Sequence, residues 1–153
     1  MEIKVIAGKR MMPERQHPDD AGADLKADAT WWIEPGSTRM VGTGTRWEIP
    51  RGHVGLVFAR SSLAVEKGLT LANGVGVIDA GYQGEVMVPL HNCTGTFVTI
   101  SKGERIAQMV IVPIATPELV MVDSFDAPTE RGEGGFGSTG KWGKLYDEME
   151  AEG

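Results

Sequence analysis

The sequence predicts an all-β domain, a sandwich or barrel of short strands, followed by a glycine-rich C-terminal arm. Short apolar segments alternate with polar residues, turn signals recur about every ten residues, and a single segment has the pattern of a helix. The composition of the 153 residues, 41% hydrophobic and 24% charged, is that of one globular domain with a core. We place the domain at residues 1–123 and the arm at residues 124–153.

The first half of the chain is predicted to hold short strands separated by turns. Residues 8–22 are polar and rich in turn formers, and Pro50-Arg51-Gly52 marks a further turn. The expected strands are Glu2–Ala7, a strand that opens at Gly22, Thr30–Glu34, one or two strands within Arg39–Ile49, and a strand in which Val54, Leu56 and Phe58 alternate.

A helix and a central hairpin follow. Ser61–Lys67 is predicted to be a short helix with a serine N-cap and Gly68 as its stop. We interpret residues 71–92 as a hairpin in which two apolar runs flank a glycine-rich turn that carries Asp79 and Tyr82. A ring and a carboxylate at one hairpin tip can hold a flat base and present an acid beside it. The alternative is an ordinary hairpin with a solvated aspartate.

The last strands predict an oligomer. Thr96–Ile100, Arg105–Ile114 and Glu118–Val122 have strand patterns. Both faces of Arg105–Ile114 are apolar, with Ile106 expected on one face and Ala107 on the other. A β-domain of this size seldom buries both faces of a strand by itself, so we expect a homo-oligomer to cover the second face. From Ser124 onward the chain is rich in glycine and poor in aliphatic residues, which predicts a mobile arm.

The bulk properties argue against several function classes. The net charge of −6 argues against non-specific nucleic-acid binding, which needs basic surface, and it favours a bound divalent cation. No apolar run approaches the ~20 residues of a membrane span, and the N-terminus lacks the apolar stretch of a signal peptide. Cys93 is the only cysteine, so neither an intrachain disulfide nor a thiolate zinc site is expected. These features predict a soluble protein of the cytoplasm.

Polar residues around the predicted helix are candidates for an anion site. Arg60, Ser61 and Ser62 join a strand to the helix and offer a guanidinium, two hydroxyls and backbone amides. A plain serine cap beside a solvated arginine is the alternative. Gln108 is a lone amide in an apolar strand, where it must hydrogen-bond to protein or to ligand because an unpaired buried amide costs ~1–3 kcal/mol.

The glycine-rich segment 130–141 is a candidate phosphate-binding loop. Its glycines expose amide donors, and Arg131 adds a fixed positive charge. Gly135, Gly140 and Lys141 imitate the start of a Walker A loop, but Trp142 stands where Ser or Thr would bind magnesium. A P-loop NTPase is therefore rejected, and a merely flexible glycine-rich tail remains the alternative.

Five segments, in this order, resemble the motifs of the trimeric dUTPase (dUTP diphosphatase) family. They are Ala21–Leu25, Arg60–Ala64, Asn73–Gly84, Gly103–Met109 and Arg131–Gly140. Each motif alone is moderately specific, whereas five in the right order and spacing are very specific. The resemblance implies a distorted jelly-roll of the dUTPase-like β-clip type and a homotrimer with active sites between subunits. It also implies hydrolysis of dUTP to dUMP and pyrophosphate with Mg2+, which keeps uracil out of DNA and supplies dUMP for dTMP synthesis.

The resemblance also implies roles for individual residues. Asp79 is similar to the general base that orients and deprotonates the water attacking the α-phosphorus, and Asp24 to the acid that supports the metal through water. Tyr82 resembles the ring under the deoxyribose that leaves no room for a 2′-hydroxyl. The other implied substrate contacts are Arg60, Ser61, Ser62 and Gln108 at the phosphates, Asn73, Gly76, Val77, Ile78 and Met87 of the hairpin, Arg131, Gly137, Ser138 and Thr139 of the arm, and Phe136 stacked on the uracil.

Two rival functions are weighed against this one. The related dCTP deaminase needs a glutamate on the strand after the Asp79 turn, where Pro89 stands here, and Glu85 lies too close to the turn to replace it. A regulatory or scaffold protein that keeps the fold is the second rival, yet all the catalytic-type residues are present.

The sequence also departs from the family pattern at two places. Ala59 and Ser62 stand where many members have Pro and Gly, and the chain continues past the fifth motif. In that extension Trp142, Leu145, Tyr146 and Met149 have helical spacing, typical either of a frayed acidic tail or of a short helix that docks on a neighbouring subunit.

Overall fold

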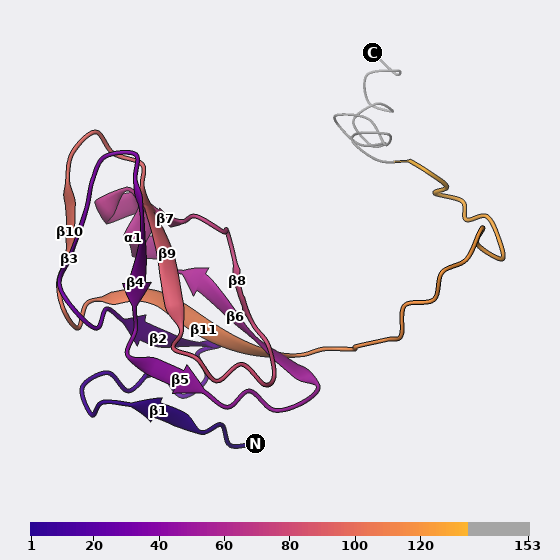
Figure 1. Cartoon of the computed structure of the whole chain (residues 1–153), viewed down its shortest axis with the longest axis horizontal. Helices are drawn as coiled ribbons and strands as arrows, with labels where there is room; N and C mark the ends of the chain where they lie inside the picture. Colours follow the sequence, from indigo (N-terminus) through magenta and orange to yellow (C-terminus); the bar gives the residue numbers. More distant parts are fainter. Residues whose placement is uncertain (135–153) are drawn as a thin grey trace, which may run out of the picture. The chain divides into compact units, whose positions relative to one another are not determined.

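The computed structural model describes residues 1–134 and divides the chain into two units. Unit 1, Met1–Thr116, contains every strand and helix found among the described residues (Figure 1). Unit 2, Pro117–Gly153, has neither a helix nor a strand in its described part, residues 117–134. No helix of residues 1–134 is long and apolar enough to cross a membrane.

Unit 1 is nearly all β, as predicted. Its elements in chain order are β1 Val5–Ala7, β2 Gly22–Lys26, β3 Trp31–Ile33, β4 Thr38–Gly42, β5 Thr45–Trp47, β6 His53–Ala59, α1 Ser61–Lys67, β7 Leu69–Leu71, β8 Gly76–Ile78, β9 Met87–Asn92, β10 Val98–Ile100 and β11 Arg105–Pro113. The prediction of one or two strands in residues 39–49 resolves into two, β4 and β5.

Two sheets face each other around the core. One has four strands in the order β2-β11-β6-β8, and the other has three in the order β4-β9-β7; two antiparallel pairs, β1-β5 and β10-β3, complete the unit (Figure 1). The inward side chains of both sheets join one apolar cluster that includes Leu25, Val57 and Met109 from the first sheet and Val88 and Leu90 from the second. The central strands of both sheets alternate so that one face of each is buried in this core.

Helix α1 confirms the predicted segment but not its predicted cap. The N-cap residue is Arg60, and no side chain caps the helix there. At the other end Gly68 has φ +62 and donates its N–H to carbonyls of the last turn, so the predicted glycine stop is confirmed. Glycine is favoured in that left-handed conformation because it lacks a Cβ.

The predicted central hairpin is wrong. β8 pairs with β6 at Val57↔Gly76, whereas β9 pairs with β4 and β7, so the two apolar runs on either side of Asp79 belong to different sheets. The turn between them therefore crosses from one sheet to the other. Its position at that crossing is what exposes Asp79 and Tyr82 at the edge of unit 1.

The predicted strand Glu118–Val122 is also wrong for the single chain. This segment is not paired to any strand, and its apolar side chains are exposed: Leu119, Val120, Met121 and Val122. A strand pattern becomes a strand only when a neighbouring strand accepts its hydrogen bonds. The described part of one chain does not provide that neighbour.

Strand β11 contains a bulge that changes its two faces. Arg105 is opposite Lys26 and Ala107 is opposite Leu25, so β11 has one residue more than β2 at this point. Ile106 and Ala107 are consequently both buried, although strict alternation predicts them on opposite faces. Beyond the bulge, Met109 faces the core, while Val110 and Val112 remain only half-buried in the single chain.

Candidate functional site

The turn between β8 and β9 lines one cavity with most of the predicted nucleoside-binding residues. This cavity, called the nucleoside cavity below, measures about 340 Å³. Seven predicted residues contribute to its wall: Asn73, Gly76, Val77, Ile78, Asp79, Tyr82 and Met87. Five further residues that were not predicted complete it: Met40, Val57, Leu71, Glu85 and Pro89. The cavity combines an apolar wall with a few polar groups, which is the usual character of a small-molecule site.

The Tyr82 ring is fixed at this cavity by its own turn. The Tyr82 N–H donates to the Asp79 carbonyl at 3.1 Å, and the Tyr82 hydroxyl donates to the Glu85 carbonyl at 2.9 Å. The ring folds over Gly84, where an added Cβ would overlap the phenol. Gly84 therefore allows the ring to lie flat against the backbone, and the carboxylate of Asp79 remains exposed beside it.

Glu85, which the sequence analysis excluded as a replacement for the deaminase glutamate, is one of the residues that line this cavity. Its Oε1 accepts a hydrogen bond from the Gly44 N–H at 2.8 Å, which ties the carboxylate to the connection between β4 and β5. Pro89, at the position where the deaminase needs its acid, presents an apolar surface to the same cavity.

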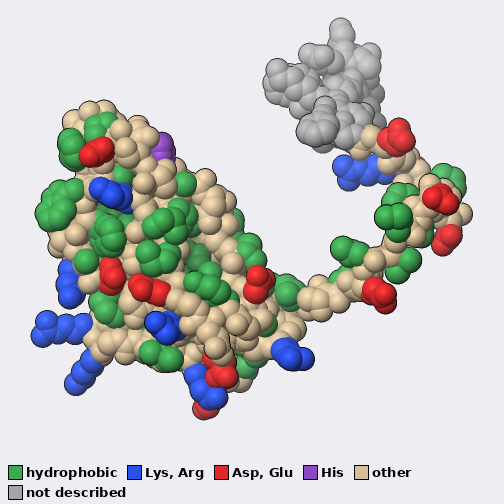
Figure 2. Space-filling view, viewed as in Figure 1, with side chains coloured by type: hydrophobic (Ala, Val, Ile, Leu, Met, Phe, Trp, Pro, Cys, Tyr) green, Lys and Arg blue, Asp and Glu red, His purple; other side chains and the backbone are tan. Residues whose placement is uncertain are grey.

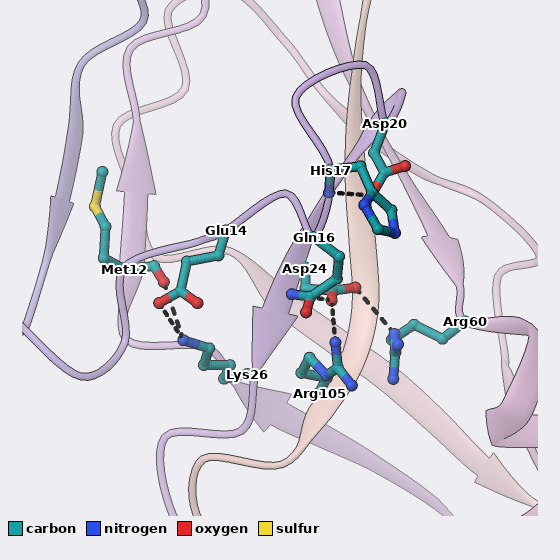
Figure 3. Close-up of polar contacts among 9 residues, drawn as sticks. All are labelled: Met12, Glu14, Gln16, His17, Asp20, Asp24, Lys26, Arg60 and Arg105. Carbon is teal, nitrogen blue, oxygen red and sulfur yellow. Dashed lines mark hydrogen bonds and ion pairs between the residues drawn. The ribbon is translucent and has the colours of Figure 1, made fainter.

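Two predicted site residues, Asp24 and Arg60, meet in a polar cluster that also contains Arg105 and Gln16 (Figure 3). Asp24 lies on β2 and is 7% exposed. Its Oδ1 pairs with the Arg60 Nε at 2.9 Å, and its Oδ2 pairs with the Arg105 Nη1 at 3.0 Å. The Gln16 amide lies 3.4 Å from Oδ2. One carboxylate therefore holds together the strand β2, the start of α1 and the start of β11.

Residues 8–21 support this cluster from the side of β2. Glu14 forms a β-bridge with Asp24, and the Asp24 N–H donates to the Glu14 carbonyl at 2.9 Å. Lys26 pairs with the Glu14 carboxylate at 2.9 Å and donates to the Met12 carbonyl at 3.3 Å. The polar segment that the sequence marked only as turn-rich thus fixes the backbone on which Asp24 stands.

The two arginines line a separate cavity of about 300 Å³. Its other walls come from α1 and from the turn before β11, with Ser62, Lys67 and Glu104 among the lining residues. Lys67 and Glu104 pair with each other at 2.7 Å. No lining residue is common to this cavity and the nucleoside cavity. In one chain the two cavities are therefore separate, and of the predicted phosphate contacts Arg60 and Ser62 line the second one.

The remaining predicted phosphate contacts have different surroundings. Within the described residues, the hydroxyls of Ser61 and Ser62 make no hydrogen bond to another group. Gln108 donates to the Ala59 carbonyl at 3.4 Å, which confirms that this lone amide finds a partner. Its side chain also lies against Gly22, where a Cβ would collide with the Gln108 amide.

Of the predicted arm residues, Arg131 lies within the residues that the structure describes and the others do not. Arg131 is exposed in unit 2, where its Nε donates to the Gly134 carbonyl at 3.2 Å. Phe136, Gly137, Ser138 and Thr139 lie outside the described residues, as does the predicted helical spacing of Trp142 to Met149.

The surface around these cavities mixes charges. Figure 2 shows acidic, basic and hydrophobic side chains interspersed on the visible face of unit 1, and that face carries no broad basic area. Proteins that bind nucleic acid without sequence preference concentrate lysine and arginine on one face. The visible face lacks that electrostatic pattern, in line with the net charge of −6.

A family model described as dUTPase matches residues 9–140. The chain belongs to the dUTPase family. Two similar relatives are both named deoxyuridine 5′-triphosphate nucleotidohydrolase. The protein from Mycolicibacterium gilvum is 46% identical over 134 residues, which covers 84% of this chain and 87% of the relative. The protein from Desulfitobacterium hafniense is 47% identical over 132 residues, with the same two coverages.

Solved dUTPase structures share the fold. The dUTPase of Staphylococcus bacteriophage 80alpha with dUpNHpp has a TM-score of 0.85 and 36% identity, over 92% of this chain and 99% of that chain. The dUTPase of Streptococcus mutans has a TM-score of 0.73 and 31% identity, over 77% of this chain and 99% of that chain. The predicted all-β dUTPase fold is therefore confirmed.

Proposed function

We propose that this chain hydrolyses dUTP to dUMP and pyrophosphate by attack of water on the α-phosphorus. The observation that carries the proposal is the nucleoside cavity, in which an exposed carboxylate, Asp79, stands beside a fixed aromatic ring, Tyr82. Membership of the dUTPase family and the names of the relatives support the same reaction. Removing dUTP keeps uracil out of DNA and supplies dUMP for dTMP synthesis.

Substrate selection follows from the cavity wall. Asn73 and the backbone of β8 offer donors and acceptors to the edge of a pyrimidine, so cytosine presents the wrong pattern. The Tyr82 ring packs under the sugar, where a 2′-hydroxyl would meet an apolar surface. The related phage enzyme was solved with dUpNHpp, an analogue of dUTP, and we assign the same class of ligand to this cavity.

Asp79 is the proposed general base. A carboxylate accepts a proton from water and holds the water in line for attack, and it needs only hydrogen-bond reach to do so. The Tyr82 N–H donates to the Asp79 carbonyl at 3.1 Å, which holds the backbone of the two residues in one turn. Correct placement of water and phosphorus accounts for a large part of the rate gain in such reactions.

Mg2+ is the proposed cofactor, carried in with the triphosphate. Residues 1–134 contain no group of three or more His, Cys, Asp or Glu side chains that could hold a metal ion by themselves. Both oxygens of Asp24 are engaged by arginines, so its carboxylate fits an indirect role through water. This donor set suits Mg2+, which keeps several waters and is commonly held by substrate phosphates. The ion would neutralise phosphate charge during attack.

The complete active site is proposed to form between subunits of a homotrimer. The two cavities of one chain share no lining residue, and the outer face of the four-stranded sheet leaves Leu56, Phe58 and Val110 half-buried. The exposed apolar segment 119–122 adds further surface for a neighbouring copy. Arg131, Phe136, Gly137, Ser138 and Thr139 are proposed to close over the bound nucleotide from the arm. Such closure excludes bulk water.

Pyrophosphate release from four nucleotides tests the proposed reaction. We expect release from dUTP and at least ~100-fold less from dCTP, dTTP and UTP, because each of these presents an unmatched polar group or an added atom to the cavity. Chelation of Mg2+ should slow the reaction with dUTP. Because Glu85 also lines the cavity, ammonia release from dCTP is measured in parallel. Ammonia without pyrophosphate would replace the proposal with deamination.

A further inference from the structure

The Asp24 cluster consists of Asp24, Arg60, Arg105 and Gln16. The proposed reaction assigns no role to Arg105. It lies at the start of β11, and its guanidinium pairs with Asp24 at 3.0 Å, on the opposite oxygen from Arg60. Figure 3 shows the carboxylate between the two guanidinium groups. In the sequence Arg105 stands at a turn–strand junction inside the motif Gly103–Met109, and the resemblance gives it no role of its own.

The bulge in β11 determines where Arg105 points. With strict alternation Arg105 would share a face with Ala107 and Met109, both of which are fully buried in the core. The extra residue between Arg105 and Ala107 moves Arg105 to the outer face, opposite Lys26. Bulges of this kind re-aim a side chain at the cost of local pairing. The bulge thus puts this guanidinium beside Asp24.

The charges around Asp24 do not balance. Two guanidinium groups share the single carboxylate of Asp24, while Lys26 is separately paired with Glu14 and Lys67 with Glu104. The Asp24 cluster therefore carries one excess positive charge. The cluster therefore attracts an anion and repels a further cation.

The two arginines keep donors available towards the 300 Å³ cavity that both line. A guanidinium has five N–H donors. Among the described residues, Arg60 uses its Nε and Arg105 its Nη1 in side-chain pairs, and Arg105 is 38% exposed. Glu66 at the wall of the cavity is exposed to solvent. The remaining N–H groups match phosphate oxygens, which accept bidentate pairs from arginine.

We propose that Arg105 is a second polyphosphate-binding arginine of the active site and that Asp24 is the positioning residue that holds Arg105 and Arg60 together for it. The proposal rests on the proposed dUTP hydrolysis. Attack requires the α-phosphorus beside Asp79, which lines the nucleoside cavity. Arg105 lines the other cavity, so it meets the phosphates beyond the α-phosphate.

Equilibrium binding of two nucleotides tests the proposal. The probes are dUpNHpp, which carries three phosphorus groups, and dUMP, which carries one. For Arg105→Gln we expect roughly 10- to 100-fold weaker binding of dUpNHpp, the loss that follows from removing hydrogen bonds to a charged group. Binding of dUMP should change by less than about 2-fold, because the α-phosphate lies at the other cavity. Arg105→Lys should give an intermediate loss, since it keeps the charge without the planar fork.

Arg46→Gln is the matched control. Arg46 is an exposed arginine on β5 that lines neither cavity, and its loss should leave both affinities unchanged. A purely structural role for Arg105 predicts equal weakening of dUpNHpp and dUMP together with a lower melting temperature, and that result overturns the proposal. Unchanged binding of dUpNHpp by Arg105→Gln overturns it as well. Should Arg105→Gln not fold, the same comparison is decided with Arg105→Lys.

Measurements on the wild type distinguish a failure of the proposed function from a failure of the role proposed for Arg105. If the wild type releases pyrophosphate from dUTP and Arg105→Gln binds dUpNHpp normally, the role of Arg105 is wrong and the proposed function stands. If the folded wild type neither binds dUpNHpp nor releases pyrophosphate, the proposed function fails, and the role of Arg105 fails with it.

Discussion

At the scale of single residues, the contact between Tyr82 and Gly84 determines the shape of the nucleoside cavity. The Tyr82 hydroxyl is held by the Glu85 carbonyl at 2.9 Å, so the ring cannot move aside without losing a hydrogen bond. Gly84 has no Cβ, and the ring occupies the space that a Cβ would fill. The position of the ring is therefore set by backbone and by one missing methyl group.

Gly84→Ala tests this arrangement. The added methyl group displaces the ring, and we expect kcat/KM for dUTP to fall by about 100-fold, the order of loss that follows a misplacement of about 1 Å in an active site. Steady-state pyrophosphate release measures the change. Gly95→Ala is the control, because a Cβ at Gly95 has no atom within 4 Å and should leave kcat/KM unaltered. Equal kcat/KM values for the two variants would show that the ring position is not fixed by Gly84.

Cavity residues that stand close together in one sequence motif could be predicted from the sequence. Cavity residues that the pairing of distant strands brings together could not. Asp79, Tyr82 and Asn73 stand in one glycine-rich segment whose composition already indicates a ligand site. Met40 and Pro89 reach the same cavity because β4 pairs with β9 in a register that puts them side by side. Nothing in the local pattern of either strand specifies that pairing.

At the scale of elements, local signals located the strands and the helix but not their partners. Gly68 predicted the end of α1 because its conformation is a local property, and the structure confirms it. The hairpin around Asp79 was wrong because β8 follows β6 into the four-stranded sheet while β9 enters the other sheet. Sequence adjacency favours pairing of neighbouring strands, and here the tertiary packing of two sheets overrides it.

The bulge in β11 changes the direction of individual side chains. One extra residue between Arg105 and Ala107 buries Ile106 and Ala107 together and turns Arg105 outward. A binary pattern of apolar and polar residues assumes a constant period of two, so it cannot reveal a single-residue insertion. The pattern therefore did not indicate that Arg105 faces outward beside Asp24.

At the scale of the whole molecule, the outer face of the four-stranded sheet connects assembly with activity. Gln108 and Asp24 lie opposite each other on that face, and Val110 lies two residues further along β11. The residues proposed to bind phosphate therefore border the apolar surface proposed to meet a neighbouring copy. A trimer would bring these residues to the nucleoside cavity of another chain.

Val110→Glu tests the assembly. A carboxylate at the centre of an apolar interface is costly to bury, so we expect the variant to sediment near the chain mass of 16.4 kDa instead of three times that mass. Pyrophosphate release from dUTP should fall with it. Sedimentation velocity measures the mass, and Thr99→Glu, an exposed substitution on β10, is the control. A monomeric Val110→Glu with full activity would contradict a site shared between subunits.

The most direct test of the central claim is pyrophosphate release from dUTP by wild type and by Asp79→Asn under identical conditions with Mg2+. Asparagine keeps the size of the side chain but cannot take a proton from water, so we predict a loss of at least ~100-fold in kcat, within the range assigned to a general base. Glu34→Gln, which removes an exposed carboxylate outside both cavities, should keep wild-type kcat. A folded Asp79→Asn that releases pyrophosphate as fast as the wild type would contradict the assignment of Asp79 and the mechanism built on it.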